Sequence, residues 1–280
     1  MSKASSSPLP AHHTKHLSIL DYPFINSRYM LAQSDDGATN GTALWLGAQC
    51  LSLYFAHIVA KLPKSGTPGR RPRVIELGSG VGLTALVLSS LGWDVLATDL
   101  CNVTATVLSR NVAQNTPQLH SGTIEIRELD WMISPEDWTW DNDEVIASAS
   151  RTRQESDARP TDVLGPPFDF IITSDTFYAP ALTAPLLRTL YALSVQSLIG
   201  GRGPPIYICI ERRDPVLIDQ ALEAARVTWG FSTDRVPQKK VARAMEKGGV
   251  KWPREDWEGV EIWKMSLDPN CASLQSAVSE

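Results

Sequence analysis

The sequence predicts an α/β fold: a mostly parallel sheet of seven strands with helices on both faces and an antiparallel hairpin at its C-terminal end. Three observations lead to this prediction. Short apolar runs alternate with longer segments of helical periodicity, a glycine-rich loop follows the first buried run, and an acidic residue ends the second. In open parallel sheets, ligands bind outside the carboxyl ends of the strands. We therefore expect one large domain with its ligand site at that edge.

The N-terminal segments are expected to pack beside this sheet. Residues 1–16 are rich in Ser, Pro and His and predict a disordered leader, and residues 17–33 predict short paired strands. Residues 42–61 carry apolar side chains at helical spacing, which predicts an amphipathic helix. Residues 64–71 form a Gly/Pro/basic stretch that predicts a loop leading to the first strand.

The central segments predict two βα units and a third strand. Residues 74–77 and 95–98 are short apolar runs typical of buried parallel strands. The helical segments after them are residues 84–91 and 104–115. Residues 123–129 alternate between apolar and charged side chains, which predicts a strand with one solvated side.

A polar stretch separates the third strand from the fourth. Residues 134–166 are rich in charges, serines and prolines and predict a surface insertion, part of which is helical around residues 135–149. Residues 168–173 and 206–210 then predict buried strands, and residues 181–198 predict the helix between them.

The C-terminal part completes a single domain over residues 17–268. A helix is predicted over residues 215–229, with proline at its first position. Residues 231–236 and 260–265 predict two strands that pair antiparallel at one edge of the sheet. Residues 269–280 predict a flexible tail.

The glycine-rich loop indicates the ligand. Residues 74–83 read V-I-E-L-G-S-G-V-G-L, so the glycines follow E-x-G-x-G-x-G, and Leu83 stands where a dinucleotide fingerprint requires glycine. A pyrophosphate is an anion and disfavours a neighbouring carboxylate such as Glu76. S-adenosyl-L-methionine (AdoMet) carries a sulfonium and an amino group, which suit that acid, and Asp99 can accept hydrogen bonds from both ribose hydroxyls.

Composition bounds the function. The 280 residues carry a net charge of -5 and a sequence pI near 5.6, which argues against a nucleic-acid binder. No apolar stretch is long enough to span a bilayer, and the four cysteines show no C-x-x-C or metal-ligand spacing. We expect no metal site, since the histidines at 12, 13 and 16 lie in the leader. A cytoplasmic or nuclear monomer is expected.

Several polar and aromatic residues directly follow predicted strands, and so are expected to line one cleft. Trp131 either covers a purine face or belongs to the core. Asp175 and Tyr178 fit an acid and an aromatic that position a lysine ammonium; Asp175 alternatively caps a helix or anchors a loop. The segment E-R-R at residues 211–213 also follows a strand.

With these motifs assembled, the chain resembles the seven-β-strand, class I AdoMet-dependent protein-lysine methyltransferases of the methyltransferase-like 21 group, or methyltransferase family 16. The resemblance runs from about residue 41 to residue 265. It is carried by A-L-W-L-G-A-Q-C-L-S-L-Y, E-L-G-S-G-V-G-L, V-L-A-T-D-L, R-N-V-A-Q-N, L-D-W, F-D-F-I-I-T-S-D-T-F-Y and I-C-I-E-R-R-D.

The resemblance implies a Rossmann-like fold and a set of site residues. Asp175 and Tyr178 are implied to lie at the entrance for the acceptor lysine. The implied cofactor-binding residues are Trp45, Glu76, Gly78, Ser79, Gly80, Asp99, Trp131 and Ser174.

The implied function is AdoMet-dependent transfer of methyl to a lysine amine of a cytosolic protein, with elongation factors and chaperone-like ATPases as typical family substrates. Two alternatives remain open: methylation of a small molecule or another nucleophile, and a non-catalytic AdoMet-binding scaffold. RNA methylation is disfavoured, because S-D-T-F-Y stands where such enzymes often carry N/D-P-P-Y/F.

Overall fold

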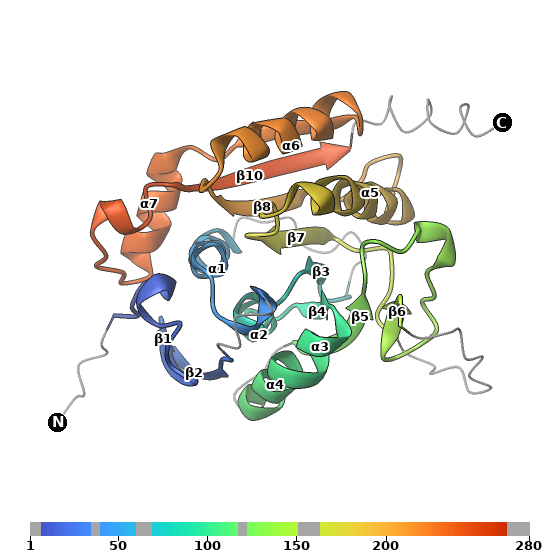
Figure 1. Cartoon of the computed structure of the whole chain (residues 1–280). Helices are drawn as coiled ribbons and strands as arrows, with labels where there is room; N and C mark the ends of the chain where they lie inside the picture. Colours follow the sequence, from blue (N-terminus) through green and yellow to red (C-terminus); the bar gives the residue numbers. More distant parts are fainter. Residues whose placement is uncertain (1–6, 35–39, 60–68, 117–121, 151–162, 268–280) are drawn as a thin grey trace.

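The computed structural model describes residues 7–34, 40–59, 69–116, 122–150 and 163–267. Its main sheet contains β3 (Arg73–Leu77), β4 (Asp94–Asp99), β5 (Thr123–Leu129), β6 (Val145–Ala147), β7 (Phe170–Ser174), β8 (Ile206–Glu211), β9 (Phe231–Arg235) and β10 (Val260–Leu267). These eight strands lie in the order β6-β5-β4-β3-β7-β8-β10-β9 (Figure 1). The α/β class is confirmed, and the count of seven strands is corrected to eight because β6 lies within the predicted insertion.

The order of the strands places a switch point at β3. This strand pairs in parallel with β4 on one side and with β7 on the other. Ligands bind at such a point, outside the carboxyl ends of the strands, and the glycine loop follows β3 directly. The predicted terminal hairpin is confirmed, since β10 pairs antiparallel with both β8 and β9.

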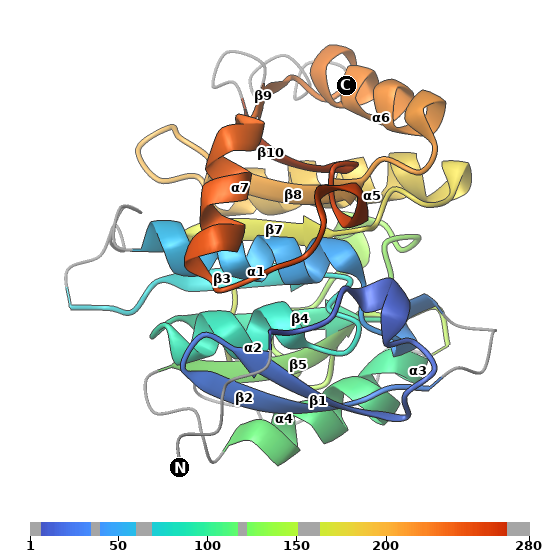
Figure 2. The ribbon, with the colours of Figure 1, turned by 90° about the vertical axis from the view of Figure 1, so that its left-hand side faces the viewer.

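Helices cover both faces of the sheet and give each face its own apolar core (Figures 1 and 2). One face carries α1 (Leu46–Ile58), α2 (Leu83–Ser90), α4 (Ser109–Asn115) and α7 (Gln238–Lys247). The other carries α5 (Pro180–Gln196) and α6 (Pro215–Val227). Among the described residues, no helix combines the length and apolarity needed to cross a membrane.

Helix α1 is buried nearly all round, which corrects the amphipathic helix predicted there. Its polar side chains Gln49 and Ser52 are as inaccessible as Leu51 and Phe55. The helix packs against α2, α7 and β8, and the hairpin of β1 (Ile19–Phe24) and β2 (Ser27–Ala32) joins the same core. Because α1 is enclosed by several elements, its polar side chains can be used as internal anchors.

The predicted disordered leader is ordered from residue 7 onwards. The short helical turn η1 (Ala11–His13) is held where Ala11 N donates to Gln49 Oε1 at 2.8 Å and Gln49 Nε2 donates to the Leu9 carbonyl at 2.9 Å. Gln33 Nε2 donates to the Thr14 carbonyl at 2.9 Å. Composition missed this packing because its anchors lie 19 and 38 residues away in sequence. Residues 1–6 lie outside the described residues.

The predicted insertion is partly built into the fold. Helix was expected around residues 135–149, but the structure has a single turn at η6 (Pro135–Asp137) and then β6, which extends the sheet beside β5. Trp138 and Ile146 are buried in the core that contains α5 and α6. These apolar contacts outweigh the polar composition from which a surface segment was predicted. Residues 151–162 and the tail at 268–280 lie outside the described residues.

Candidate active site

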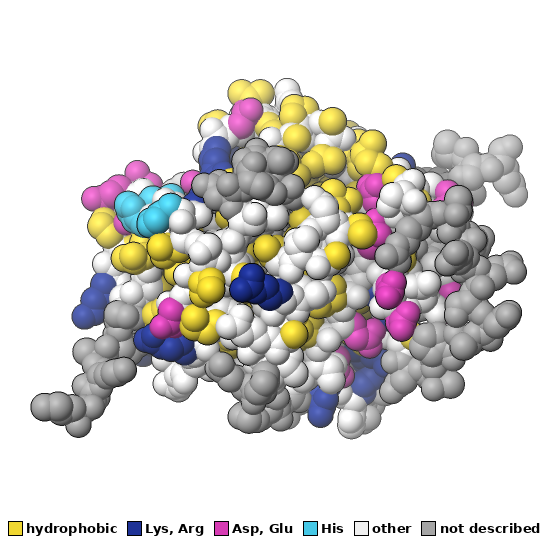
Figure 3. All heavy atoms as spheres, turned by 60° about the horizontal axis from the view of Figure 1, so that its bottom comes forward, with side chains coloured by type: hydrophobic (Ala, Val, Ile, Leu, Met, Phe, Trp, Pro, Cys, Tyr) yellow, Lys and Arg dark blue, Asp and Glu magenta, His cyan; other side chains and the backbone are white. Residues whose placement is uncertain are grey.

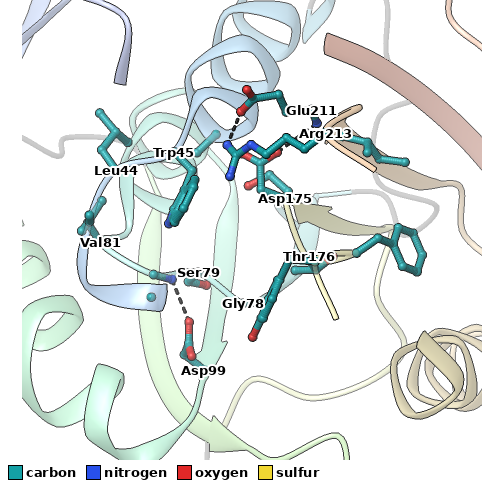
Figure 4. Close-up of a pocket in the computed structure, with 18 of the residues that line it drawn as sticks. Leu44, Trp45, Gly78, Ser79, Val81, Asp99, Asp175, Thr176, Glu211 and Arg213 are labelled. Atoms are coloured by element: carbon teal, nitrogen blue, oxygen red, sulfur yellow. Dashed lines mark hydrogen bonds and ion pairs between the residues drawn. The ribbon is translucent and has the colours of Figure 1, made fainter. Parts of the chain in front are cut away.

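A cavity of about 360 Å³ lies at the carboxyl ends of the strands around β3 (Figure 4). Residues that are far apart in sequence meet there, at or just after the ends of β3, β4, β5, β7 and β8 or at the start of α1. The predicted site residues that line it are Trp45, Gly78, Ser79, Gly80, Asp99, Trp131, Ser174, Asp175 and Tyr178. Of the predicted set, Glu76 alone is not among the lining residues.

The glycine loop is fixed against β4 by Asp99. Gly80 N donates to Asp99 Oδ2 at 2.8 Å, and Leu100 N donates to Asp99 Oδ1 at 2.8 Å. Gly80 has φ +54, and a Cβ there would lie 3.1 Å from the carbonyl oxygen of Gly41. Glycine is therefore required both by the left-handed backbone and by this close approach. Burial raises the pKa of Asp99 to about 6, against the lowering effect of the two amides.

Glu76 lies behind the loop instead of in the cavity. The side chain is 1% exposed, and its Oε2 has no hydrogen-bond partner among the described residues. Burial raises the pKa of Glu76 to about 8, which outweighs the opposing effect of the Ser79 hydroxyl. The carboxyl is thus held under the glycine loop, mostly protonated at neutral pH when no cation is near.

Trp131 covers the glycine loop from the side of β5. Its ring lies 3.4 Å from the position a Cβ would take on Gly78. Arg188 of α5 holds this loop by donating to the backbone carbonyl of Trp131 at 2.8 Å. The indole Nε1 is buried without a hydrogen-bond partner among the described residues, and other atoms of Trp131 line the cavity.

Asp175 joins the start of α1 to the end of β8. Gly47 N donates to Asp175 Oδ2 at 2.7 Å, and Glu211 N donates to Asp175 Oδ1 at 3.1 Å. Asp175 has φ +54, a left-handed conformation that Asp tolerates better than most residues. Burial raises its pKa to about 6, and the two amides and Arg213 oppose that rise. The sequence left three roles open for Asp175: positioning a lysine ammonium, capping a helix or anchoring a loop. The two hydrogen bonds show the anchoring role directly.

Two cations lie over the ring of Trp45, the residue that precedes α1. The Lys15 Nζ is 3.2 Å and the Arg213 Cζ is 4.4 Å from the ring centroid. Arg213 also forms an ion pair with Glu211 (Figure 4). Tyr178 lies at the rim of the cavity with 51% of its surface exposed. This side of the cavity therefore combines an aromatic face with carboxylates, which suits a cationic group.

Some lining residues were outside the predicted set. Asp214 lines the cavity directly after the E-R-R segment, whose Glu211 and Arg213 were expected at this edge and do line it. Gly41 and Ala43 also line it, and they enter through a loop whose path depends on tertiary packing.

A surface group could hold a metal ion, although the sequence predicted none. His12, His13 and Asp256 bring possible ligand atoms within 4.8 Å of one another. Figure 3 shows histidine side chains gathered beside acidic side chains on one face of the molecule. None of the three lines the cavity, so they take no part in the site described above.

Comparison with known proteins confirms the resemblance read from the motifs. Residues 25–151 match the family model described as lysine methyltransferase. Protein N-lysine methyltransferase METTL21A of Danio rerio is 31% identical over 123 residues, which are 44% of this chain and 53% of that protein. Protein-lysine methyltransferase METTL21E of Mus musculus is 29% identical over 126 residues, 45% of this chain and 42% of that protein. The chain thus spans about half the length of these relatives.

Among solved structures, a putative SAM-dependent methyltransferase from Streptococcus mutans aligns with a TM-score of 0.47 at 9% identity. The alignment covers 89% of this chain and 56% of that one.

Proposed function

We propose that this chain, which carries the lysine methyltransferase match over residues 25–151, is an AdoMet-dependent protein-lysine N-methyltransferase. One observation carries the proposal. A single cavity joins a glycine loop braced by Asp99 to a second half formed by Trp45, Asp175 and Glu211. The first half suits a nucleoside-containing cofactor, and the second suits the ammonium group of a lysine side chain.

The first half of the cavity fits AdoMet. Asp99 offers carboxylate oxygens to ribose hydroxyls, and Trp131 offers an aromatic face. Glu76 supplies a buried acid near the loop, which a positive charge would favour in its ionised form. When bound, AdoMet supplies a methyl group on a sulfonium, activated for transfer to a nucleophile.

The second half supports a lysine acceptor. A lysine amine has a reference pKa of about 10.4 and must lose its proton before it can act as a nucleophile. Carboxylates and the Trp45 face bind the ammonium form as it enters, and desolvation inside the cavity lowers its pKa. Tyr178 at the rim orients the aliphatic part of the lysine. Catalysis then depends mainly on holding the amine close to the methyl group and in line with it.

The surface at this edge of the sheet favours a protein acceptor over a small molecule. Met132, Tyr178 and Val216 are 59%, 51% and 65% exposed. They follow β5, β7 and β8 respectively, and so lie at the same edge of the sheet as the cavity. Exposed apolar side chains around a site are typical of a surface that binds another protein. We further propose that the enzyme acts as a monomer on a cytoplasmic or nuclear protein, such as an elongation factor or a chaperone-like ATPase.

The test is methyl transfer in an extract of cells from the protein's own source that lack this gene. The purified protein is incubated with labelled AdoMet and the extract, and labelled proteins are identified by mass spectrometry. We expect one discrete protein carrying methyl-lysine. The Gly80→Arg variant is the control, since a side chain at that position would collide with Gly41 and close the cofactor half. Absence of any labelled protein, with AdoMet binding verified, would contradict the proposal.

A further inference from the structure

We propose that Glu211 is the residue that receives the acceptor ammonium, and that Arg213 occupies this position until the acceptor lysine displaces it. The inference rests on the proposed function and assigns a substrate-binding role that the resemblance gave to Asp175. It follows from the hydrogen bonds and the ion pair that the carboxylates lining the cavity already make.

Among the described residues, four carboxylates line the cavity, and three of them each accept two backbone hydrogen bonds. Asp99 accepts from Gly80 and Leu100, and Asp175 accepts from Gly47 and Glu211. Asp214 caps α6 by accepting from Val216 N at 3.1 Å and Leu217 N at 3.0 Å. These bonds hold the loops that form the cavity and fix the orientation of the three carboxylates, so each can offer only its remaining lone pairs to a ligand.

Glu211 differs in that its carboxylate is held by a side chain. Arg213 Nη2 donates to Glu211 Oε2, and both residues line the cavity (Figure 4). The Glu211 side chain is 28% exposed and that of Arg213 is 48% exposed. A pair this accessible to solvent is weak, because water competes for both partners. The guanidinium can therefore move into solvent at small cost and leave the carboxylate to a new cation.

The surroundings of Arg213 match the needs of a lysine ammonium. Its guanidinium lies 4.4 Å from the Trp45 ring centroid, beside Glu211, and Asp175 adds a favourable charge interaction. An aromatic face with a carboxylate beside it binds cations in general, and two cations, Lys15 and Arg213, lie over this ring. Of the two, Arg213 lines the cavity and pairs with Glu211. The neighbouring Arg212 behaves differently, since it is fixed by Glu261 and Asp219.

The test compares Glu211→Gln and Arg213→Ala in the extract assay, with the amount of extract varied to give an apparent KM for the acceptor. Glu211→Gln should raise this KM about tenfold or more, as expected for loss of a charged hydrogen bond, and leave the Kd for AdoMet within about twofold. Arg213→Ala should lower the KM severalfold, because the acceptor no longer has to displace the guanidinium. The matched control is Glu223→Gln, which removes an exposed ion pair with Arg226 outside the cavity and should change neither value.

Opposite effects of the two substitutions are the decisive result. If Arg213→Ala raises the KM as much as Glu211→Gln does, the pair is structural and the inference is wrong. It is also wrong if Glu211→Gln leaves the KM unchanged while the wild type labels its substrate; the proposed function then stands. If the wild type binds AdoMet and labels nothing, both fail together.

Discussion

The carboxylate of Asp175 accepts a hydrogen bond from the backbone amide of Gly47 at 2.7 Å, across 128 residues of sequence. This contact ties the first turn of α1 to the carboxyl end of β7. The same turn follows Trp45, so the acceptor side of the cavity is positioned by a bond between two elements that are distant in the chain. An acid that looked catalytic in sequence thus has a visible role in assembling the site.

This contact leaves no room for a side chain at position 47. A Cβ on Gly47 would lie 2.5 Å from Asp175 Oδ2, so Gly47→Ala forces the helix and the strand end apart. We expect a loss of about 1–3 kcal/mol in the free energy of unfolding, typical of overpacking, together with a strong loss of methyl transfer. Urea denaturation and the extract assay measure the two effects. Gly259→Ala is the matched control, because nothing lies within 4 Å of a Cβ there, and equal behaviour of the two variants would contradict the expectation.

Substituting Asp175 by Asn separates hydrogen bonding from backbone strain. Asn tolerates the left-handed conformation at φ +54 as well as Asp does, but its amide cannot accept through both terminal atoms. Either Gly47 N or Glu211 N then lacks its acceptor. We expect a loss of about 1–3 kcal/mol in the free energy of unfolding and near-abolition of lysine methylation. Unchanged lysine-directed activity would show that the anchor is dispensable.

The buried Glu76 predicts a dependence of stability on pH. Its pKa rises from 4.5 to about 8 on folding, so the folded protein holds the extra proton between these values. The resulting stabilisation is complete below pH 4.5 and is lost as the pH rises through 8. Burial also raises the pKa values of Asp99 and Asp175, so the stabilisation that they contribute also falls as the pH rises, but it is lost by about pH 6. Between pH 6 and 9 the decline therefore reports Glu76.

The measurement is chemical denaturation of the ligand-free protein at several pH values from 6 to 9. We expect the free energy of unfolding to fall by on the order of 1–3 kcal/mol over this range in the wild type. Glu76→Gln, which keeps a neutral side chain of the same shape, should flatten the curve. A wild-type curve that rises with pH, or a variant with the same slope, would contradict this account.

The hydrogen bond between Asp99 and the glycine loop predicts that substituting Asp99 lowers the affinity for AdoMet. Asp99→Asn removes one of the two accepting oxygens, so either the Gly80 amide or the Leu100 amide loses its hydrogen-bond acceptor. In the proposed complex, a ribose hydroxyl of AdoMet loses an acceptor as well. We expect the Kd for AdoMet to rise by roughly tenfold to a hundredfold, measured by calorimetry. Asp94→Asn is the control at the opposite end of the same strand, where the carboxylate pairs with Arg71. Equal affinities in the two variants would remove Asp99 from the cofactor site.

Much of the fold was predictable because it depends on local periodicity. The glycine loop after β3, the acid after β4 and the apolar runs of β7 and β8 all lie where the sequence predicted, since buried parallel strands leave short apolar runs between turn residues. Where composition guided the prediction, the structure departs from it in part: the leader packs from residue 7 onwards, and Trp138 and β6 build part of residues 134–166 into the fold. A few buried residues such as Ala11 and Trp138 decide whether a polar segment packs against the core. The average composition of the segment does not reveal such single residues.

The sequence by itself determined the class of fold, the edge of the sheet where the site lies and most of the polar and aromatic residues that line it. The tertiary structure decided what each acid does. Glu76, Asp99, Asp175 and Glu211 are all acids at or just beyond strand ends, and no local pattern distinguishes them. Their roles differ because one is buried behind a loop, two accept hydrogen bonds from backbone amides and one pairs with a half-exposed arginine. Hydrogen bonds between distant segments set these environments, and such bonds leave no trace in local sequence.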